Sequence, residues 1–234
     1  MPLFKDKMTD WYAVSNKETK GTGIKPDKNF PKHMIKPCSM ISIVGSTGAG
    51  KSTALVEFLS RKDNSFCEII IFSGSTGDEP LLNLLKTHIE GIQILDDVDD
   101  LPELTKYNDE EKGIERLMVF DDFINLPKKQ LVKIQKWFNS ARKYGFTCIC
   151  MAQNYTDIPI QMRRNTMYWI LFRLNDINTI NNILKNHNNN GDDKNAVKSA
   201  YFVSTRDSKN FFVLDLTANS PARYRHNFTD VIQL

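Results

Sequence analysis

The spacing of apolar residues divides most of the chain into two kinds of segment, which alternate from Met40 onward. Short apolar runs rich in β-branched residues are typical of buried strands, whereas apolar residues recurring every three or four positions are typical of helices. The expected strands are Met40–Val44, Glu68–Phe72, Ile92–Leu95, Leu117–Phe120, Phe146–Met151 and Met167–Leu174. The expected helices are Lys51–Arg61, Pro80–His88, Pro127–Tyr144 and Asp176–Asn186. This order predicts an α/β fold, with a central, mainly parallel sheet flanked by helices.

The C-terminal part follows a different pattern. The asparagine-rich stretch 186–193 predicts a loop. Beyond it, Ser199–Thr205 and Asn210–Thr217 each alternate apolar and polar residues, on either side of the turn-like sequence Arg206–Lys209. Alternation of this kind across a short polar connection indicates two antiparallel strands. The sequence therefore predicts a C-terminal β-hairpin formed by these two segments.

Residues 1–37 contrast with the rest, because they are polar and interrupted by glycine and proline. They hold eight lysines against four acidic residues, which predicts a basic, mostly irregular leader before a single domain at 38–234. Such a leader either contacts nucleic-acid phosphates or is simply solvated. The acidic stretch Asp96–Glu111 is interpreted as a solvated loop.

Composition narrows the class of protein. The chain has 234 residues, with 41% hydrophobic and 25% charged residues, as is usual for a globular domain. No apolar run is long enough to predict a membrane segment, and the first residues lack the apolar core of a secretory signal. The four cysteines have no metal-ligand or redox spacing and are interpreted as reduced thiols. The net charge of +3 is too small to indicate nucleic-acid binding by itself.

One glycine-rich segment carries the clearest chemistry. Gly45–Ser52 reads GSTGAGKS and fits GxxxxGK[ST], directly after one expected strand and before one expected helix. Backbone N–H groups in such a loop and the following helix N-terminus bind phosphate oxygens. The predicted nucleotide-binding residues are Gly45, Ser46, Thr47, Gly48, Ala49, Gly50, Lys51, Ser52 and Thr53. Lys51 is expected to contact the β- and γ-phosphates, and the Ser52 hydroxyl to bind Mg²⁺.

Two acids follow the strand Leu117–Phe120. P-loop enzymes hold Mg²⁺ through an acid at a strand end, so Asp121 is the expected metal residue. Asp122 is the expected general base for the attacking water. The same pair could also serve as a helix cap and a turn. The distance in sequence from Lys51 leaves room for an intervening strand and helix, which favours the ASCE, RecA-like branch of P-loop NTPases over a small nucleotide kinase.

Four further residues are candidates for sensing or accelerating hydrolysis. Gln153 follows the strand after the acids, where a buried amide could contact the γ-phosphate or the water. An arginine stabilises the charge that develops on the γ-phosphate, often from a neighbouring subunit. Arg142, between the long helix and this strand, is one candidate for that role. Arg163 and Arg164 are the alternatives, and each of the three could also be an ordinary surface arginine.

The segments KPCSMISIVGSTGAGKS, MVFDD, ARKYGFTCICMAQN, IPIQMRRN and ARYRHNF together resemble the genome-packaging ATPases of the FtsK–HerA superfamily. They are most similar to those of large DNA viruses of eukaryotes and their virophages. The resemblance runs from about Phe30 to the C-terminus and implies a trans-acting arginine at Arg142 and a sensor glutamine at Gln153. Many members of the superfamily have Glu where this chain has Asp122, so the expected base has a shorter side chain here.

The resemblance implies an ATP- and Mg²⁺-dependent motor that forms a homo-oligomeric ring, a hexamer or a pentamer. It implies double-stranded DNA in the central channel, a viral capsid vertex as partner, and a place in the host cytoplasm, the viral factory or the virion. A helicase or segregation-type translocase of the same superfamily is the alternative. A nucleotide-switch binding module is disfavoured, because the chain lacks a guanine-specifying Asn/Thr-Lys-x-Asp run.

Overall fold

The computed structural model describes residues 27–63, 65–74, 80–107, 113–187, 191–218 and 221–234. These residues contain a nine-stranded sheet in the order β3-β2-β4-β5-β1-β6-β7-β8-β9. The strands are β1 (Met40–Val44), β2 (Glu68–Ser73), β3 (Gln93–Leu95), β4 (Arg116–Asp121), β5 (Phe146–Ala152), β6 (Tyr168–Leu171), β7 (Phe212–Asp215), β8 (Tyr224–His226) and β9 (Asp230–Val231). Strands β1 to β6 are parallel, and β7 to β9 add antiparallel pairs at one edge. The predicted α/β architecture with a mainly parallel sheet is confirmed.

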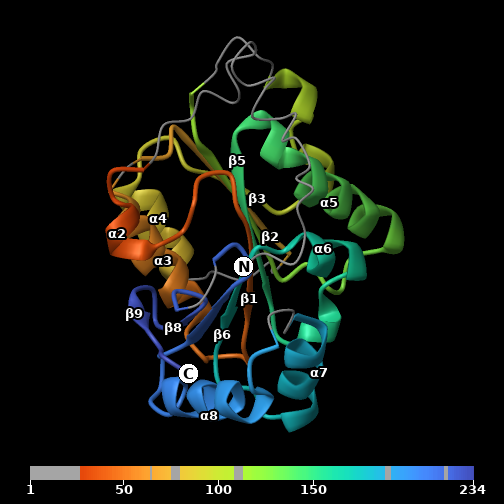
Figure 1. The fold of residues 1–234 in the computed structure, drawn as a ribbon. Coiled ribbons are helices and arrows are strands. Elements are labelled where there is room, and N and C mark those ends of the chain that lie inside the picture. The colour runs from red at the N-terminus through yellow and green to blue at the C-terminus, as the bar shows by residue number, and fades with distance from the viewer. Residues whose placement is uncertain (1–26, 64, 75–79, 108–112, 188–190, 219–220) are drawn as a thin grey trace, which may run out of the picture.

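Helices cover both faces of the sheet, as expected for parallel strands with apolar residues on each side. The helices are α2 (Phe30–His33), α3 (Lys51–Lys62), α4 (Pro80–His88), α5 (Lys128–Ser140), α6 (Ile160–Asn165), α7 (Ile177–His187) and α8 (Lys194–Ser204). Helices α3 and α4 pack in one apolar cluster, and α5 to α8 pack in another. In Figure 1, α2, α3 and α4 lie on one side of the strands, and α5, α6 and α7 on the other. The core therefore has two layers, one on each side of the sheet.

The order of the strands places β5 between β1 and β4. Val44 is paired with Ala152, and Phe120 with Cys150, so the three strands end close together. Parallel strands present their carboxyl ends at the same edge of a sheet, and ligands bind outside that edge in open α/β sheets. The segments that follow β1, β4 and β5 therefore meet at one site.

The C-terminal hairpin is present, but one of its predicted strands is wrong. Asn210–Thr217 contains β7, which pairs with β8 and not with Ser199–Thr205. The latter segment completes α8, whose first turn is capped by the Asp193 side chain accepting from the Asn195 N–H. Val197 and Tyr201, four residues apart, are buried on one helical face, and the Tyr201 hydroxyl bonds to the backbone of Phe172 and Leu174. This tertiary packing outweighs the local alternation.

Part of the predicted leader packs against the domain. Lys62, at the end of α3, is 1% exposed and donates to Asp27 Oδ2 at 2.6 Å and to Glu115 Oε2 at 2.8 Å. His33 Nε2 lies 3.0 Å from the same Asp27 oxygen, and the His33 Nδ1 accepts from the Ile35 N–H. This buried cluster connects residues 27–35 to α3 and to the residue before β4. Residues 1–26 of the predicted leader lie outside the described residues.

Within the described ranges, no helix is both long enough and apolar enough to cross a membrane.

Candidate functional site

The loop after β1 closes on its own lysine. Gly45 N donates to Ala152 O at 3.2 Å, which ties the start of the loop to the end of β5. Lys51, the first residue of α3, donates from Nζ to Gly45 O at 2.7 Å and to Ser46 O at 3.2 Å. The loop is therefore wrapped around the ammonium group, which lies where a bound anion would meet both this charge and the positive end of α3.

Gly50, the N-cap of α3, has a φ of 112°, which disfavours any residue with a Cβ. A Cβ at this position would also lie 3.2 Å from the Phe172 ring and 3.3 Å from Lys209 Cα. The connection before β7 and the residue after β6 therefore pack directly against the phosphate-binding loop. The sequence did not predict these two neighbours.

The end of β4 forms a sharp turn. Asp121 Oδ1 accepts from the Asp122 N–H at 3.0 Å, and Asp122 has a φ of 48°, in the left-handed region. Gly74, directly after β2, donates its N–H to Asp121 O at 3.0 Å, and an ideal Cβ on it would overlap the Asp122 carbonyl oxygen. Strain of this kind, held by surrounding backbone, is common at functional sites. The sequence prediction missed Gly74, although a glycine directly after a buried strand was an available signal.

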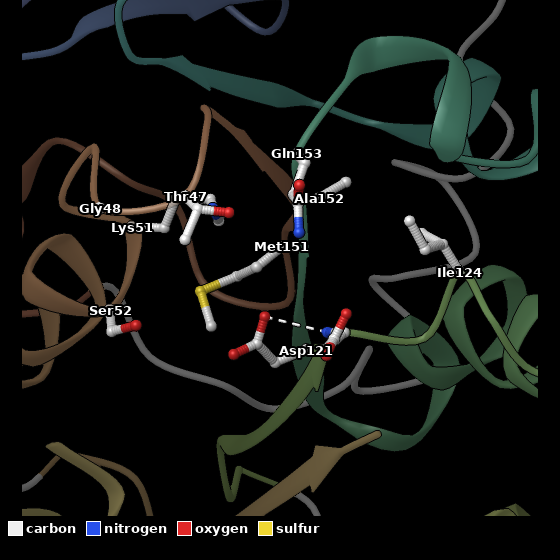
Figure 2. A pocket seen from close by; sticks show the side chains of 10 residues that line it. Thr47, Gly48, Lys51, Ser52, Asp121, Ile124, Met151, Ala152 and Gln153 are labelled. Carbon is white, nitrogen blue, oxygen red and sulfur yellow. Dashed lines mark hydrogen bonds between the residues drawn. The ribbon is translucent and has the colours of Figure 1, made fainter. Parts of the chain in front are cut away.

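These segments line one pocket, shown in Figure 2. The lining residues are Thr47, Gly48, Lys51, Ser52, Asp121, Asp122, Ile124, Met151, Ala152 and Gln153. In Figure 2, Lys51 and Ser52 lie on the left and Ile124 on the right, with Met151 and Gln153 from the β5 end and Asp121 from the β4 end between them. Residues far apart in sequence thus meet at the edge that the strand order predicts.

The predicted loop residues take different positions. Thr47, Gly48, Lys51 and Ser52 line the pocket, while Gly45, Ser46, Ala49 and Gly50 complete the turn around it. Thr53 is exposed on α3 and is not among the lining residues. Gln153 does line the pocket, but its expected burial is wrong: it follows the last residue of β5 and is exposed. An exposed amide at the pocket mouth is free to reorient when a ligand binds.

The three candidate arginines lie away from the pocket. Arg142 is exposed in the 3-10 helix Ala141–Tyr144, before β5, whereas Gln153 follows β5. Seven strand residues separate these ends, about 23 Å at 3.3 Å per residue. Arg163 is half-buried with its guanidinium 4.6 Å from the Tyr155 ring centre, and Arg164 is exposed on α6. Arg142 therefore lies far from the pocket of its own chain.

The residues present fit a magnesium nucleotide. The ammonium of Lys51 and the N-terminal end of α3 supply positive charge for phosphates. The Ser52 hydroxyl and the Asp121 carboxylate supply the oxygen ligands that Mg²⁺ prefers. Asp122 lines the same pocket and follows Asp121 directly, so a second carboxylate is available for proton transfer.

Comparison with solved structures agrees with this architecture. The DNA-packaging ATPase B204 of Sulfolobus turreted icosahedral virus is similar over 82% of this chain and 98% of its own, with a TM-score of 0.56 and 15% identity. B204 of Sulfolobus turreted icosahedral virus 2 in complex with AMPPCP is similar over 81% and 96%, with a TM-score of 0.52 and 15% identity. The same protein with sulfate gives 86% and 100%, a TM-score of 0.54 and 16% identity. Comparison with curated proteins gives no match.

The fold and the pocket define a protein of the P-loop NTPase class. The sequence profile of the family described as Poxvirus A32 protein matches residues 28–222. The chain belongs to that family. The resemblance inferred from the sequence motifs is confirmed, while the roles of individual site residues stay predictions.

Proposed function

We propose that the chain is an ATP-hydrolysing motor that moves double-stranded viral DNA into a preformed capsid. The observation that carries the proposal is the single pocket that joins the phosphate-binding loop, the Asp121–Asp122 pair and Gln153. The similar DNA-packaging ATPase B204 supports the link between this architecture and packaging.

Hydrolysis follows from the groups in the pocket. A water oxygen bonds to the γ-phosphorus, the bond from that phosphorus to the bridging oxygen breaks, and Asp122 accepts a proton from the water. Lys51 and a Mg²⁺ ion held by Ser52 and Asp121 would neutralise the charge that develops on the phosphate oxygens. Gln153, from the pocket mouth, would orient the water or contact the γ-phosphate. The products are ADP and inorganic phosphate.

The ring form of the motor is also part of the proposal. Arg142 lies at the end of the sheet opposite the pocket, so it would complete the site of a neighbouring subunit. A ring of five or six subunits would surround the DNA and dock on a capsid vertex. Such a motor would act in the host cytoplasm or viral factory and could stay with the virion.

Replacement of the lysine tests the site. Lys51→Ala removes the ammonium that the loop surrounds, and we expect the ATP hydrolysis rate to fall by at least about 100-fold. Lys86→Ala, on the exposed part of α4, is the matched control and should leave the rate unchanged. Full turnover by Lys51→Ala would show that the assigned pocket is not the hydrolytic site.

Stimulation by DNA tests the motor function. The ATPase rate of the full chain is measured with and without double-stranded DNA, with single-stranded DNA as a comparison. A translocating motor should be stimulated by the duplex. An unchanged rate with either DNA would count against translocation.

A further inference from the structure

Acidic residues are scarce in one segment of the chain. Residues 123–175 hold nine lysines and arginines and one acidic residue, Asp157, a net charge of +8. The whole chain has a net charge of +3, so the remaining residues carry a net −5. A positive charge segregated in this way indicates a binding site for a polyanion, because charge that only keeps a protein soluble needs no such segregation.

Helix α5 places much of this charge on its outer face. Ile134, Trp137 and Phe138 are buried against the sheet. Lys129 and Lys136, seven residues apart, lie two turns apart on the opposite face, and Lys128 lies beside them. All three lysines are exposed.

Neighbouring elements extend the same surface. Helix α6 packs against α5, with Asn165 Nδ2 donating to Asn139 Oδ1 at 2.8 Å, and the two helices lie side by side in Figure 1. Arg164 is exposed on α6, and Lys143 is exposed just beyond α5. We define the basic surface as Lys128, Lys129, Lys136, Lys143 and Arg164.

Two acidic residues, Asp99 and Glu103, lie beside α5. Asp99, in the 3-10 helix Val98–Asp100 beside α5, pairs with Lys133 at 3.4 Å. Lys133 and Lys136 both line a pocket with Asp99 and Glu103, so Lys136 is at the edge of the basic surface that lies nearest this segment, whereas Lys133 is not part of the surface. Among the described residues, none of the five that form the surface makes an ion pair. Their charge is therefore available to a partner.

The dimensions fit a duplex. Helix α5 has 13 residues and is about 20 Å long, equal to about six base pairs at 3.4 Å each. Its N-terminal end follows the Asp121–Asp122 turn, and its C-terminal end leads to Arg142 and then β5. A movement of the turn or of β5 that accompanies hydrolysis would therefore be passed directly to the lysines.

We propose that the basic surface of α5 and α6 binds the sugar-phosphate backbone of double-stranded DNA. The inference rests on the proposed function and assigns to it the surface that holds the substrate. Lysine contacts to phosphates carry no base specificity, as a motor that must move any sequence requires. The surface lies outside the nucleotide pocket, so binding of DNA and of nucleotide can be separated by mutation.

The test compares two triple variants of equal charge change. The basic-surface variant is Lys128→Gln, Lys129→Gln and Lys136→Gln. The control variant is Lys86→Gln, Lys185→Gln and Lys194→Gln, at exposed lysines of α4, α7 and α8. Binding of a labelled DNA duplex is measured by fluorescence anisotropy over a series of salt concentrations, together with basal ATPase rate and oligomeric state.

Loss of three phosphate contacts should reduce the slope of log K against log salt by about 2.7, at about 0.9 per contact. We expect this in the basic-surface variant alone, with basal hydrolysis unchanged and DNA stimulation lost. If both variants keep the wild-type slope while the wild type binds DNA, the surface assignment is overturned and the proposed function stands. Loss of oligomeric state in the basic-surface variant would identify a subunit contact and also overturn the assignment. If the wild type binds no duplex, both proposals fail.

Discussion

Gly74 sets the position of the Asp122 turn, a role that the sequence pattern does not predict. An ideal Cβ on Gly74 would overlap the Asp122 carbonyl oxygen and lie 3.1 Å from the carbonyl carbon. Both neighbours are backbone atoms, so no side-chain rotation can relieve the contact. Asp122 is also held at a φ of 48°. The substitution Gly74→Ala should therefore push the turn away from β2.

The size of the effect follows from that displacement. The carbonyl must move by about 1 Å, and misplacement of a catalytic group by that distance costs about 100-fold in rate. Overpacking of a backbone contact should lower the free energy of unfolding by about 1–3 kcal/mol. The phosphate-binding loop follows β1, whereas Gly74 and Asp122 follow β2 and β4, so the ATP dissociation constant should change little. Steady-state phosphate release at saturating ATP and Mg²⁺ gives kcat, and equilibrium titration with a fluorescent ATP analogue gives the affinity.

The control is Gly91→Ala. Unlike Gly74, this glycine is exposed at a φ of 77°, with no atom within 4 Å of an added Cβ. Its substitution should cost about 1–2 kcal/mol through the backbone alone and leave kcat unchanged. A soluble, folded Gly74→Ala protein with kcat within about twofold of wild type would refute the reasoning.

Three other predictions follow from the described contacts. Arg142→Ala subunits mixed with Asp122→Asn subunits should regain ATP hydrolysis that neither shows alone, because a mixed interface joins an intact acid to an intact arginine; no recovery would argue against a trans arginine. Lys62→Met leaves two buried carboxylates without their cation and should lower the free energy of unfolding in urea by about 3–5 kcal/mol, whereas an unchanged midpoint would contradict the cluster. Burial, and then the charge of Lys62, lower the pKa of His33 to about 4, so below pH about 6.5 the unfolded chain binds a proton that the folded protein excludes. Stability in urea should therefore be full above pH about 6.5 and fall as the pH decreases toward 4, with a shallower fall in His33→Gln.

Elements with a strong local signal were predictable from the sequence. The apolar run of β1, the glycine-rich loop and α3 follow one another within a short segment, and each supports the interpretation of the next. The same holds for β4 and the acids at its end. Local patterning, burial and chemistry agree at these positions, and the structure confirms the elements.

The remaining features depend on contacts that sequence spacing does not contain. Tyr201 in α8 is fixed by the backbone of Phe172 and Leu174, and alternation in the segment around it was therefore misleading. Gly74 and Lys209 approach the site from connections that are distant in sequence. Burial of Gln153 was expected from the end of a buried strand, but the chain leaves the core at that residue.

The location of Arg142 at one end of β5 and of Gln153 at the other has a consequence for assembly. If each site is completed by the next subunit, the contact joins two different patches and not two copies of one patch. Where the rotation between neighbours closes, repetition of such a head-to-tail contact gives a ring whose two faces differ and whose subunits all point the same way around the circle. In such a ring each subunit can complete the nucleotide site of one neighbour but not of the other, so the two directions around the ring are not equivalent. The order in which subunits complete one another's sites would then be set by the fold of a single subunit.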